Sequence, residues 1–315
     1  MEKLEKVCPS QFQETLEDFV AFLQAKELRE STIFLQTKVI TSTLLKLDSY
    51  GIMQIGQITP SLIYRLYEDT SDKHNFVYPM RSFLRFLYHS GDLSRDYSHI
   101  VPARKKRYPT PSVYSDLEIE NFLATFDRSS PVDIRDYAIS MLALRLGMRT
   151  SDIVALKLNN LDFNKMKISF TQIKTEVPQC LELVPEVRIA LQDYIVNIRP
   201  NTDIQNVFLT LTNSPSPLSA QTVYCRIKKH LLTSGIDIGN RKCGAHALRM
   251  TLASELISEK VPYDVVRKIL GHEDAKTAKH YIQFDIDALR CCAIPVPPPS
   301  GRLYQYFAGK EELPL

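Results

Sequence analysis

Glycine is scarce in this sequence, with 10 glycines in 315 residues, or about half the usual share. All-β folds rich in tight turns need more glycine, because many turns require a positive φ, so the composition favours helices. Hydrophobic residues make up 44% and charged residues 24% of the chain, which excludes wholesale disorder and collagen-like or low-complexity architectures. The length leaves room for two domains of roughly 100–200 residues each.

The sequence also lacks a long apolar run. No stretch reaches the roughly 18 to 20 apolar residues that a membrane span needs. The first residues, MEKLEKVCPSQFQETLEDF, mix acidic and basic side chains, whereas a signal peptide is basic and then apolar. We therefore expect a soluble, cytoplasmic protein without a membrane partner.

Paired cysteines and clustered metal ligands are absent as well. The six cysteines show no C-x-x-C pair and no regular spacing, so neither a disulfide framework nor a zinc site is expected. No clustered set of acidic side chains indicates another metal site. We predict reduced thiols, no metal ion and no cofactor. The cysteines are Cys8, Cys180, Cys225, Cys243, Cys291 and Cys292.

A large excess of positive charge is missing too, since 39 Lys and Arg face 36 Asp and Glu, for a formal net charge of +3. This balance does not by itself indicate a nucleic-acid partner, so any basic surface must be local. One candidate lies in residues 101–114, VPARKKRYPTPSVY, which combine three prolines with four consecutive basic residues. Such a composition extends the chain and resists helix formation, and we interpret it as an interdomain linker.

Hydrophobic spacing divides the chain into four parts. Apolar residues three and four positions apart predict a helical bundle over residues 1–100, with a first helix from residue 12. After the linker at 101–114, the pattern predicts a second, mainly helical domain at 115–291 and a tail at 292–315 that opens on a proline-rich run. Within the second domain, alternating apolar residues at 164–184 predict a β-hairpin. The expected fold class is mainly α with a small antiparallel β-sheet in the second domain.

The first polar signals in the second domain concern two cations. Arg149 follows a helical run in LGMRTSD, and Asp152, three residues on, is placed to orient the guanidinium from the next turn. Lys174 lies at the predicted hairpin turn in Q-x-K-T, whereas Lys167 is expected in the first strand. Alone, the arginine and aspartate would be read as a surface ion pair of little energetic value.

Three further signals lie closer to the C-terminus. His246 and Arg249 form H-x-x-R on one face of a predicted helix, where imidazole and guanidinium can converge on a single phosphate. Leu270-Gly271-His272 ends another helix, with the glycine suited to the left-handed position that stops it. Tyr281 follows nine residues later. Individually, these residues are typical of surface pairs, helix caps and packing tyrosines.

In joint order and spacing these residues resemble the tyrosine recombinase, or phage integrase, family. Its signature is an arginine in G-x-R-x-S-E/D, a lysine on a β-hairpin, H-x-x-R, L-G-H about 26 residues on, and a tyrosine nine residues further. The resemblance covers nearly the whole chain and implies an N-terminal helical core-binding (SAM-like) bundle followed by a tyrosine-recombinase catalytic domain. Two positions depart from it: Met250 stands where many relatives have histidine or arginine, and Asp152 where glutamate is more frequent.

The resemblance implies a site-specific recombinase that cuts and rejoins DNA through a 3′-phosphotyrosyl intermediate, without metal or ATP. In that reading Arg149 and Arg249 neutralise the scissile phosphate, and Lys174 protonates the leaving 5′ oxygen. His246 accepts or relays a proton, His272 donates a hydrogen bond to the phosphate, and Tyr281 attacks it.

The family also implies partners: double-stranded DNA, a homotetramer on two DNA sites, and room for an accessory DNA-bending or directionality factor. We expect an integrase or transposase of a mobile genetic element. Alternatives are Xer-type resolution of chromosome or plasmid dimers, a type IB topoisomerase-like enzyme, and a non-catalytic DNA-binding module.

Further contacts are expected to be mostly with DNA phosphates, which position a protein without reading sequence. The candidate DNA-binding residues are Arg104, Lys105, Lys106, Arg107, Arg226, Lys228, Lys229, Arg241 and Lys242. We also expect the tail to pack on a neighbouring protomer. Its predicted apolar anchors are Leu303, Tyr304, Tyr306 and Phe307.

Overall fold

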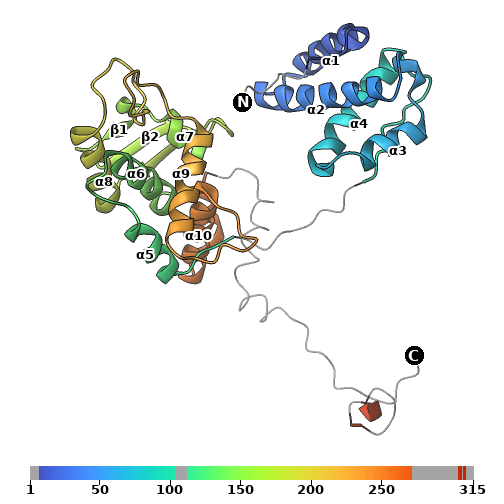
Figure 1. The fold of residues 1–315 in the computed structure, drawn as a ribbon. Coiled ribbons are helices and arrows are strands. Elements are labelled where there is room, and N and C mark those ends of the chain that lie inside the picture. The colour runs from blue at the N-terminus through green and yellow to red at the C-terminus, as the bar shows by residue number, and fades with distance from the viewer. Residues whose placement is uncertain (1–6, 104–111, 272–303, 307, 310–315) are drawn as a thin grey trace. The chain divides into compact units, whose positions relative to one another are not determined.

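A computed structural model describes residues 7–103, 112–271, 304–306 and 308–309 of the chain (Figure 1). The chain divides into two compact units, Met1–Tyr108 and Pro109–Leu315, and each is described by itself. The predicted linker residues Arg104 to Arg107 lie outside the described residues.

The first unit is a helical bundle. Its described helices are η1 (Ser10–Phe12), α1 (Gln13–Ala25), α2 (Glu30–Ser49), η2 (Ile55–Gln57), α3 (Pro60–Glu68) and α4 (Lys73–His89). Helices α1, α2 and α4 pack against one another around buried side chains such as Phe19, Leu44 and Phe83. The rings of Phe19 and Phe83 meet edge to face, with centroids 5.1 Å apart. The predicted bundle is confirmed for the described part of this unit.

The second unit holds most of the remaining helices. They are α5 (Asp116–Ala124), α6 (Pro131–Arg145), α7 (Thr150–Ala155), η3 (Leu158–Asn160), α8 (Pro185–Asn197), α9 (Ala220–Thr233), α10 (Ala245–Ser258) and α11 (Tyr263–Ile269). The short α7 was not predicted, because six residues are too few to show a helical hydrophobic period.

Helix α6 is the centre of the second unit. It begins with Pro131 in its first turn, and the Ser130 hydroxyl accepts a hydrogen bond from the backbone N–H of Asp133, which satisfies one of the unpaired donors of the helix start. Helices α8, α9 and α10 all contact it, so nearly every α6 side chain from Ile134 to Leu144 is buried. A helix enclosed in this way gives the side chains at its C-terminal end a fixed position.

The second unit also contains a three-stranded antiparallel sheet in the order β1-β2-β3. Strand β1 is Leu161–Asp162, β2 is Lys167–Thr171 and β3 is Pro178–Glu182. The pairing of β2 with β3, in which Ser169 faces Cys180, confirms the predicted hairpin. The fold class, mainly α with a small antiparallel sheet, is confirmed as well. Among the described residues, no helix is both long and apolar enough to cross a membrane.

Candidate functional site

Arg149 enters the site from a sharp turn after α6. Gly147 has a φ of +62°, and a Cβ atom on it would lie 2.6 Å from Cδ2 of Leu270, so this position requires glycine. Arg149 then caps the start of α7. Its Nη1 donates to Oε1 of Gln172 at 2.5 Å and its Nη2 donates to the backbone oxygen of Gly271 at 3.3 Å. The guanidinium is thus tied to the hairpin and to the turn that follows α11.

Asp152 does not hold Arg149 in the way the sequence predicted. Its Oδ1 accepts a hydrogen bond from the backbone N–H of Ile173 at 2.9 Å, and its side chain is buried. The prediction was wrong because spacing along one helix does not reveal a backbone donor 21 residues away in the hairpin. Asp152 fixes the hairpin turn, and Gln172 takes the place beside Arg149.

Lys174 lies in the turn between β2 and β3, with an exposed side chain, whereas Lys167 is the first residue of β2 and pairs with Glu182 across the sheet. The placement of both lysines agrees with the sequence interpretation. The turn is closed by backbone bonds from Gln172 to Val177 at 3.0 Å and from Glu176 to Gln172 at 2.8 Å. Lys174 therefore lies on a short, hydrogen-bonded support.

Arg249 is held from two sides on α10. Its side chain is buried, with a relative exposure of 3%. Nη1 donates to the backbone oxygen of Gly147, and Nη2 donates to that of Leu270 at 2.6 Å. The G-x-R, H-x-x-R and L-G-H motifs thus meet through backbone carbonyls at one place.

His246 lies among the positively charged side chains of the site. Desolvation lowers the pKa of its imidazole, and the positive charges of Lys242, Arg249, Lys174 and Arg149 lower it further. The residue nevertheless keeps exposed surface, through which a ligand can reach it. The predicted catalytic cations therefore favour the neutral form of the His246 imidazole. Several positive charges around a neutral imidazole form an environment suited to an anionic ligand.

The remaining predicted site residues divide into two groups. His272 and Tyr281 lie outside the described residues, as do Leu303 and Phe307. The described stretch 112–271 ends directly before His272. Of the predicted tail anchors, Tyr304 and Tyr306 are exposed.

The predicted DNA-contacting residues of the second unit also differ among themselves. Arg226 donates to the carboxylates of Asp133 and Asp136, and Arg241 donates to both carboxylate oxygens of Glu118, at 2.9 and 2.7 Å. These two guanidinium groups are engaged in ion pairs inside the unit and keep about a quarter of their side chains exposed, so their contact with DNA stays a prediction. Sequence alone could not separate them from their neighbours, because the acidic partners lie 90 residues or more away. The side chains that remain exposed are Lys228, Lys229 and Lys242.

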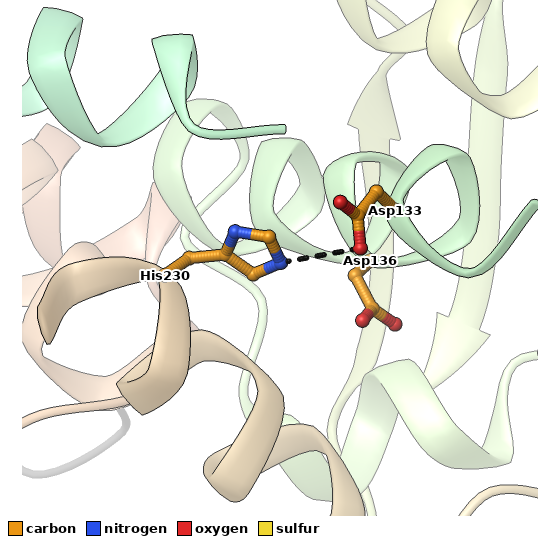
Figure 2. Close-up of side chains that lie close together, drawn as sticks. All are labelled: Asp133, Asp136 and His230. Atoms are coloured by element: carbon orange, nitrogen blue, oxygen red, sulfur yellow. Dashed lines mark ion pairs between the residues drawn. The ribbon is translucent and has the colours of Figure 1, made fainter. Parts of the chain in front are cut away.

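A second polar cluster joins α6 to α9 (Figure 2). Asp133, Asp136 and His230 bring potential metal-ligating atoms within 4.8 Å of one another. His230 is buried and lies 3.6 Å from Asp133. Desolvation lowers the pKa of its imidazole, against the effect of the two carboxylates.

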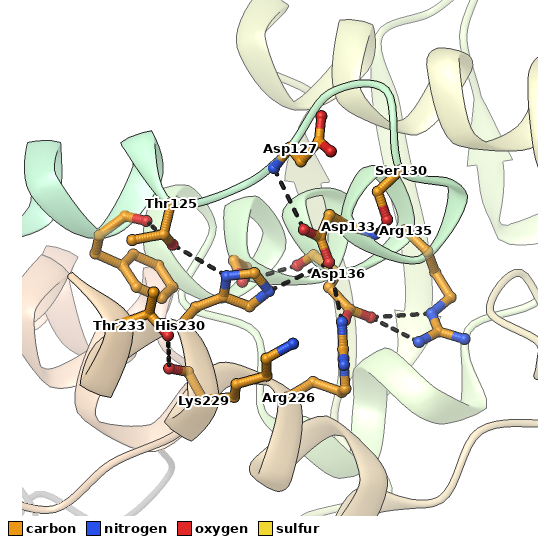
Figure 3. Close-up of polar contacts among 12 residues, drawn as sticks. Thr125, Asp127, Ser130, Asp133, Arg135, Asp136, Arg226, Lys229, His230 and Thr233 are labelled. Atoms are coloured by element: carbon orange, nitrogen blue, oxygen red, sulfur yellow. Dashed lines mark hydrogen bonds and ion pairs between the residues drawn. The ribbon is translucent and has the colours of Figure 1, made fainter.

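The same carboxylates are already engaged by cations (Figure 3). Nε and Nη2 of Arg135 donate to Asp136 at 3.0 and 2.8 Å, and Arg226 bridges Asp136 and Asp133. Because two guanidinium groups balance two carboxylates, the cluster is explained as an internal ion-pair network rather than as a metal centre.

The chain is similar to known proteins in sequence and in fold. The model of the phage integrase family matches residues 114–286, more than half of the chain. The integrase/recombinase y4rF of Sinorhizobium fredii is 30% identical over 223 residues, which cover 69% of this chain and 52% of y4rF, so the chain spans about half the length of that relative. The tyrosine recombinase XerD of Listeria monocytogenes is 26% identical over 209 residues, covering 65% of this chain and 69% of XerD.

A solved structure shows the same fold. The crystal structure of a lambda integrase dimer bound to a core site has a TM-score of 0.65 and 18% identity, covering 84% of this chain and 93% of that one. Residues 114–286, matched by the family model, include Gly147, Arg149, Lys174 and Arg249. The chain therefore belongs to the phage integrase family.

Proposed function

We propose that this protein is a site-specific tyrosine recombinase that cuts and rejoins double-stranded DNA. The observation that carries the proposal is the meeting of Arg149, Arg249 and the Leu270–Gly271 turn through hydrogen bonds, with Lys174 on the adjacent hairpin turn. This arrangement gathers cations directly before His272, in a protein whose fold is that of lambda integrase.

The chemistry follows from the needs of a phosphodiester. The linkage repels anionic nucleophiles and has a poor leaving group, so cleavage requires charge neutralisation and a proton for the 5′ oxygen. Arg149 and Arg249 remain protonated and donate hydrogen bonds to the non-bridging oxygens. They supply the positive charge that metal ions supply in other phosphoryl-transfer sites.

The covalent step uses Tyr281 as the nucleophile. Its hydroxyl oxygen forms a bond to phosphorus and gives up its proton toward His246, the bond from phosphorus to the 5′ oxygen breaks, and Lys174 supplies the proton for that oxygen. His272 donates a hydrogen bond to the phosphate. The 3′-phosphotyrosyl product stores the energy of the broken linkage, so attack by a 5′-hydroxyl of another strand rejoins DNA without ATP.

The partners follow from the same reading. Recombination exchanges four strands, so we propose a homotetramer on two DNA duplexes, with the tail of each protomer packed on a neighbour through its aromatic residues. The linker residues Arg104 to Arg107 and the exposed Lys228, Lys229 and Lys242 are proposed to contact phosphates.

For the biological role we propose the integrase or transposase of a mobile element, which fits the similarity to y4rF. Xer-type dimer resolution is the second candidate, and the similarity to XerD favours it. Inverted binding sites around a short crossover at the edge of an element, found next to the gene, would favour the first.

The test is covalent trapping on a nicked duplex that carries the DNA flanking the gene. Wild-type protein should form a protein–DNA adduct that survives denaturation. Tyr281→Phe should form none, because the nucleophilic oxygen is gone while the ring remains. Tyr64→Phe, which removes the hydroxyl of an exposed tyrosine on α3, serves as the control and should react like wild type. An adduct with Tyr281→Phe would disprove the nucleophile, and the absence of an adduct with wild-type protein would disprove the function.

A further inference from the structure

Gln172 is a buried amide at the centre of the candidate site. Its relative exposure is 3%, and it lies between β2 and the turn that carries Lys174. Oε1 accepts hydrogen bonds from Nη1 of Arg149 at 2.5 Å and from the hydroxyl of Thr175 at 2.6 Å. Nε2 donates to the backbone oxygen of Leu270 at 3.4 Å. One side chain thus contacts three separate segments of the site.

The hydrogen-bond partners determine which way the amide faces. Arg149 offers only donors and the Leu270 carbonyl is only an acceptor. The amide oxygen must therefore face the guanidinium, and the amide nitrogen must face Leu270. A flipped amide would set donor against donor on one side and acceptor against acceptor on the other.

The neutrality of this acceptor matters for Arg149. A guanidinium has five N–H donors, and within the described part of the chain Gln172 and the Gly271 carbonyl engage one each. Paired binding of a phosphate needs two of the others. Because both fixed acceptors are uncharged, the full positive charge of Arg149 is left for the substrate. A carboxylate in the same position would compete with the phosphate for that charge.

The same residue also fixes the lysine. The Gln172 backbone closes the hairpin turn through hydrogen bonds with Val177 and Glu176. Its side-chain oxygen accepts a hydrogen bond from the hydroxyl of Thr175, the residue that follows Lys174. The Gln172 side chain therefore links the hairpin turn, which Asp152 also holds, to the Arg149 guanidinium.

We propose that Gln172 is a positioning residue that acts through Arg149: its neutral amide aims the guanidinium at the scissile phosphate and joins it to the hairpin turn and to the Leu270–Gly271 turn. The inference rests on the proposed recombinase function. The sequence motif Q-x-K-T places Gln172 near the lysine, and the structure assigns it to the arginine.

The test compares substrates that differ in charge at the reacting phosphorus. One nicked duplex carries the ordinary phosphodiester at the cleavage site. A second carries a methylphosphonate at the same position, which removes the negative charge that Arg149 neutralises. The measured quantity is the ratio of strand-cleavage rates on the two duplexes. Arg149→Ala provides the reference, since loss of the guanidinium should slow cleavage of the phosphodiester far more than that of the neutral analogue.

Gln172→Glu and Gln172→Met should reproduce the pattern of Arg149→Ala. The first keeps the size and an acceptor but adds a negative charge, and the second keeps the size and removes the acceptor. Both should slow cleavage of the phosphodiester by about 10²-fold, the scale of losing one well-placed donor to a transition state, and slow the methylphosphonate much less. Gln179→Met, in β3 of the same hairpin, is the matched control and should leave the ratio unchanged.

The outcomes separate the two levels of the proposal. Equal slowing on both duplexes would mean that Gln172 only supports the fold, and wild-type rates would mean that Arg149 needs no such partner; either result overturns the inference while leaving the recombinase function intact. Failure of wild-type protein to cleave the phosphodiester would overturn the proposed function and this inference with it. Thermal unfolding of each variant, measured in parallel, identifies any that does not fold, and the two substitutions serve as replacements for each other.

Discussion

The side chain of Gln172 occupies the space beside the α-carbon of Gly271. A Cβ atom at Gly271 would lie 2.7 Å from Cδ and 2.9 Å from Oε1 of Gln172, closer than van der Waals contact allows. Gly271 also has a φ of +61°, a conformation that L-residues adopt at a cost. The glycine of L-G-H is therefore required twice, once for its backbone and once for the amide that holds Arg149.

Gly271→Ala should impair both folding and cleavage, because the new methyl group displaces the Gln172 amide from Arg149. Gly235→Ala is the matched control: this glycine has a φ of +74° but nothing within 4 Å of its Cβ position, so it should lose only about 1–2 kcal/mol of unfolding free energy and retain cleavage. Chemical denaturation and strand cleavage would be measured for both variants. If Gly271→Ala and Gly235→Ala lost the same stability and kept the same activity, the close approach of Gln172 to Gly271 would have no effect on either property.

The pKa of His246 in the DNA-free protein should lie below the ordinary histidine value of about 6.5. Desolvation lowers it first, and the neighbouring cations add to the effect. Lys174→Met should raise that pKa part of the way back, because one positive charge is removed and desolvation remains. An NMR titration of the His246 ring protons measures both values. A pKa at or above 6.5 in wild-type protein would contradict the arrangement of charges.

The lowered pKa also sets the sign of the pH dependence. The unfolded chain binds the His246 proton at a higher pH than the folded protein does, so this group contributes stability above the unfolded pKa that is lost as pH falls through the folded pKa. His246→Gln lacks the titration. As pH falls below about 6.5, the unfolding free energy of wild type should therefore decrease relative to that of His246→Gln. Denaturation at several pH values measures this difference.

Arg226 and its lysine neighbours on α9 should behave differently when replaced. Arg226→Leu leaves the buried Asp136 carboxylate with one guanidinium instead of two, and the loss of hydrogen bonds to this acceptor should cost about 1–3 kcal/mol of unfolding free energy. Lys228→Gln with Lys229→Gln should leave stability unchanged and reduce the slope of log affinity against log salt by about 0.9 for each phosphate that is no longer neutralised. Denaturation and DNA binding at several salt concentrations distinguish the roles. An unchanged slope for the lysine variant would remove those residues from the DNA interface.

Much of the architecture could be predicted from local pattern. Helical spacing predicted a helix from residue 12, and alternation predicted the hairpin at 164–184; both patterns report how a segment meets the core, so they are visible within a short window. The short α7 carried no such pattern. The linker from Arg104 to Arg107, together with His272 and Tyr281, lies outside the described residues, so their roles stay predictions.

By itself, the sequence determined the fold class, the family and the identity of the cations around the site, because these depend on residue types at fixed spacings. The near-neutral total charge was a poor guide, since what matters is where a few cations lie. Only the tertiary structure decided which acceptor holds which cation: Gln172 rather than Asp152 beside Arg149, and Asp133 and Asp136 beside Arg226. Hydrogen bonds between segments far apart in the chain depend on how those segments pack, and no local spacing encodes that.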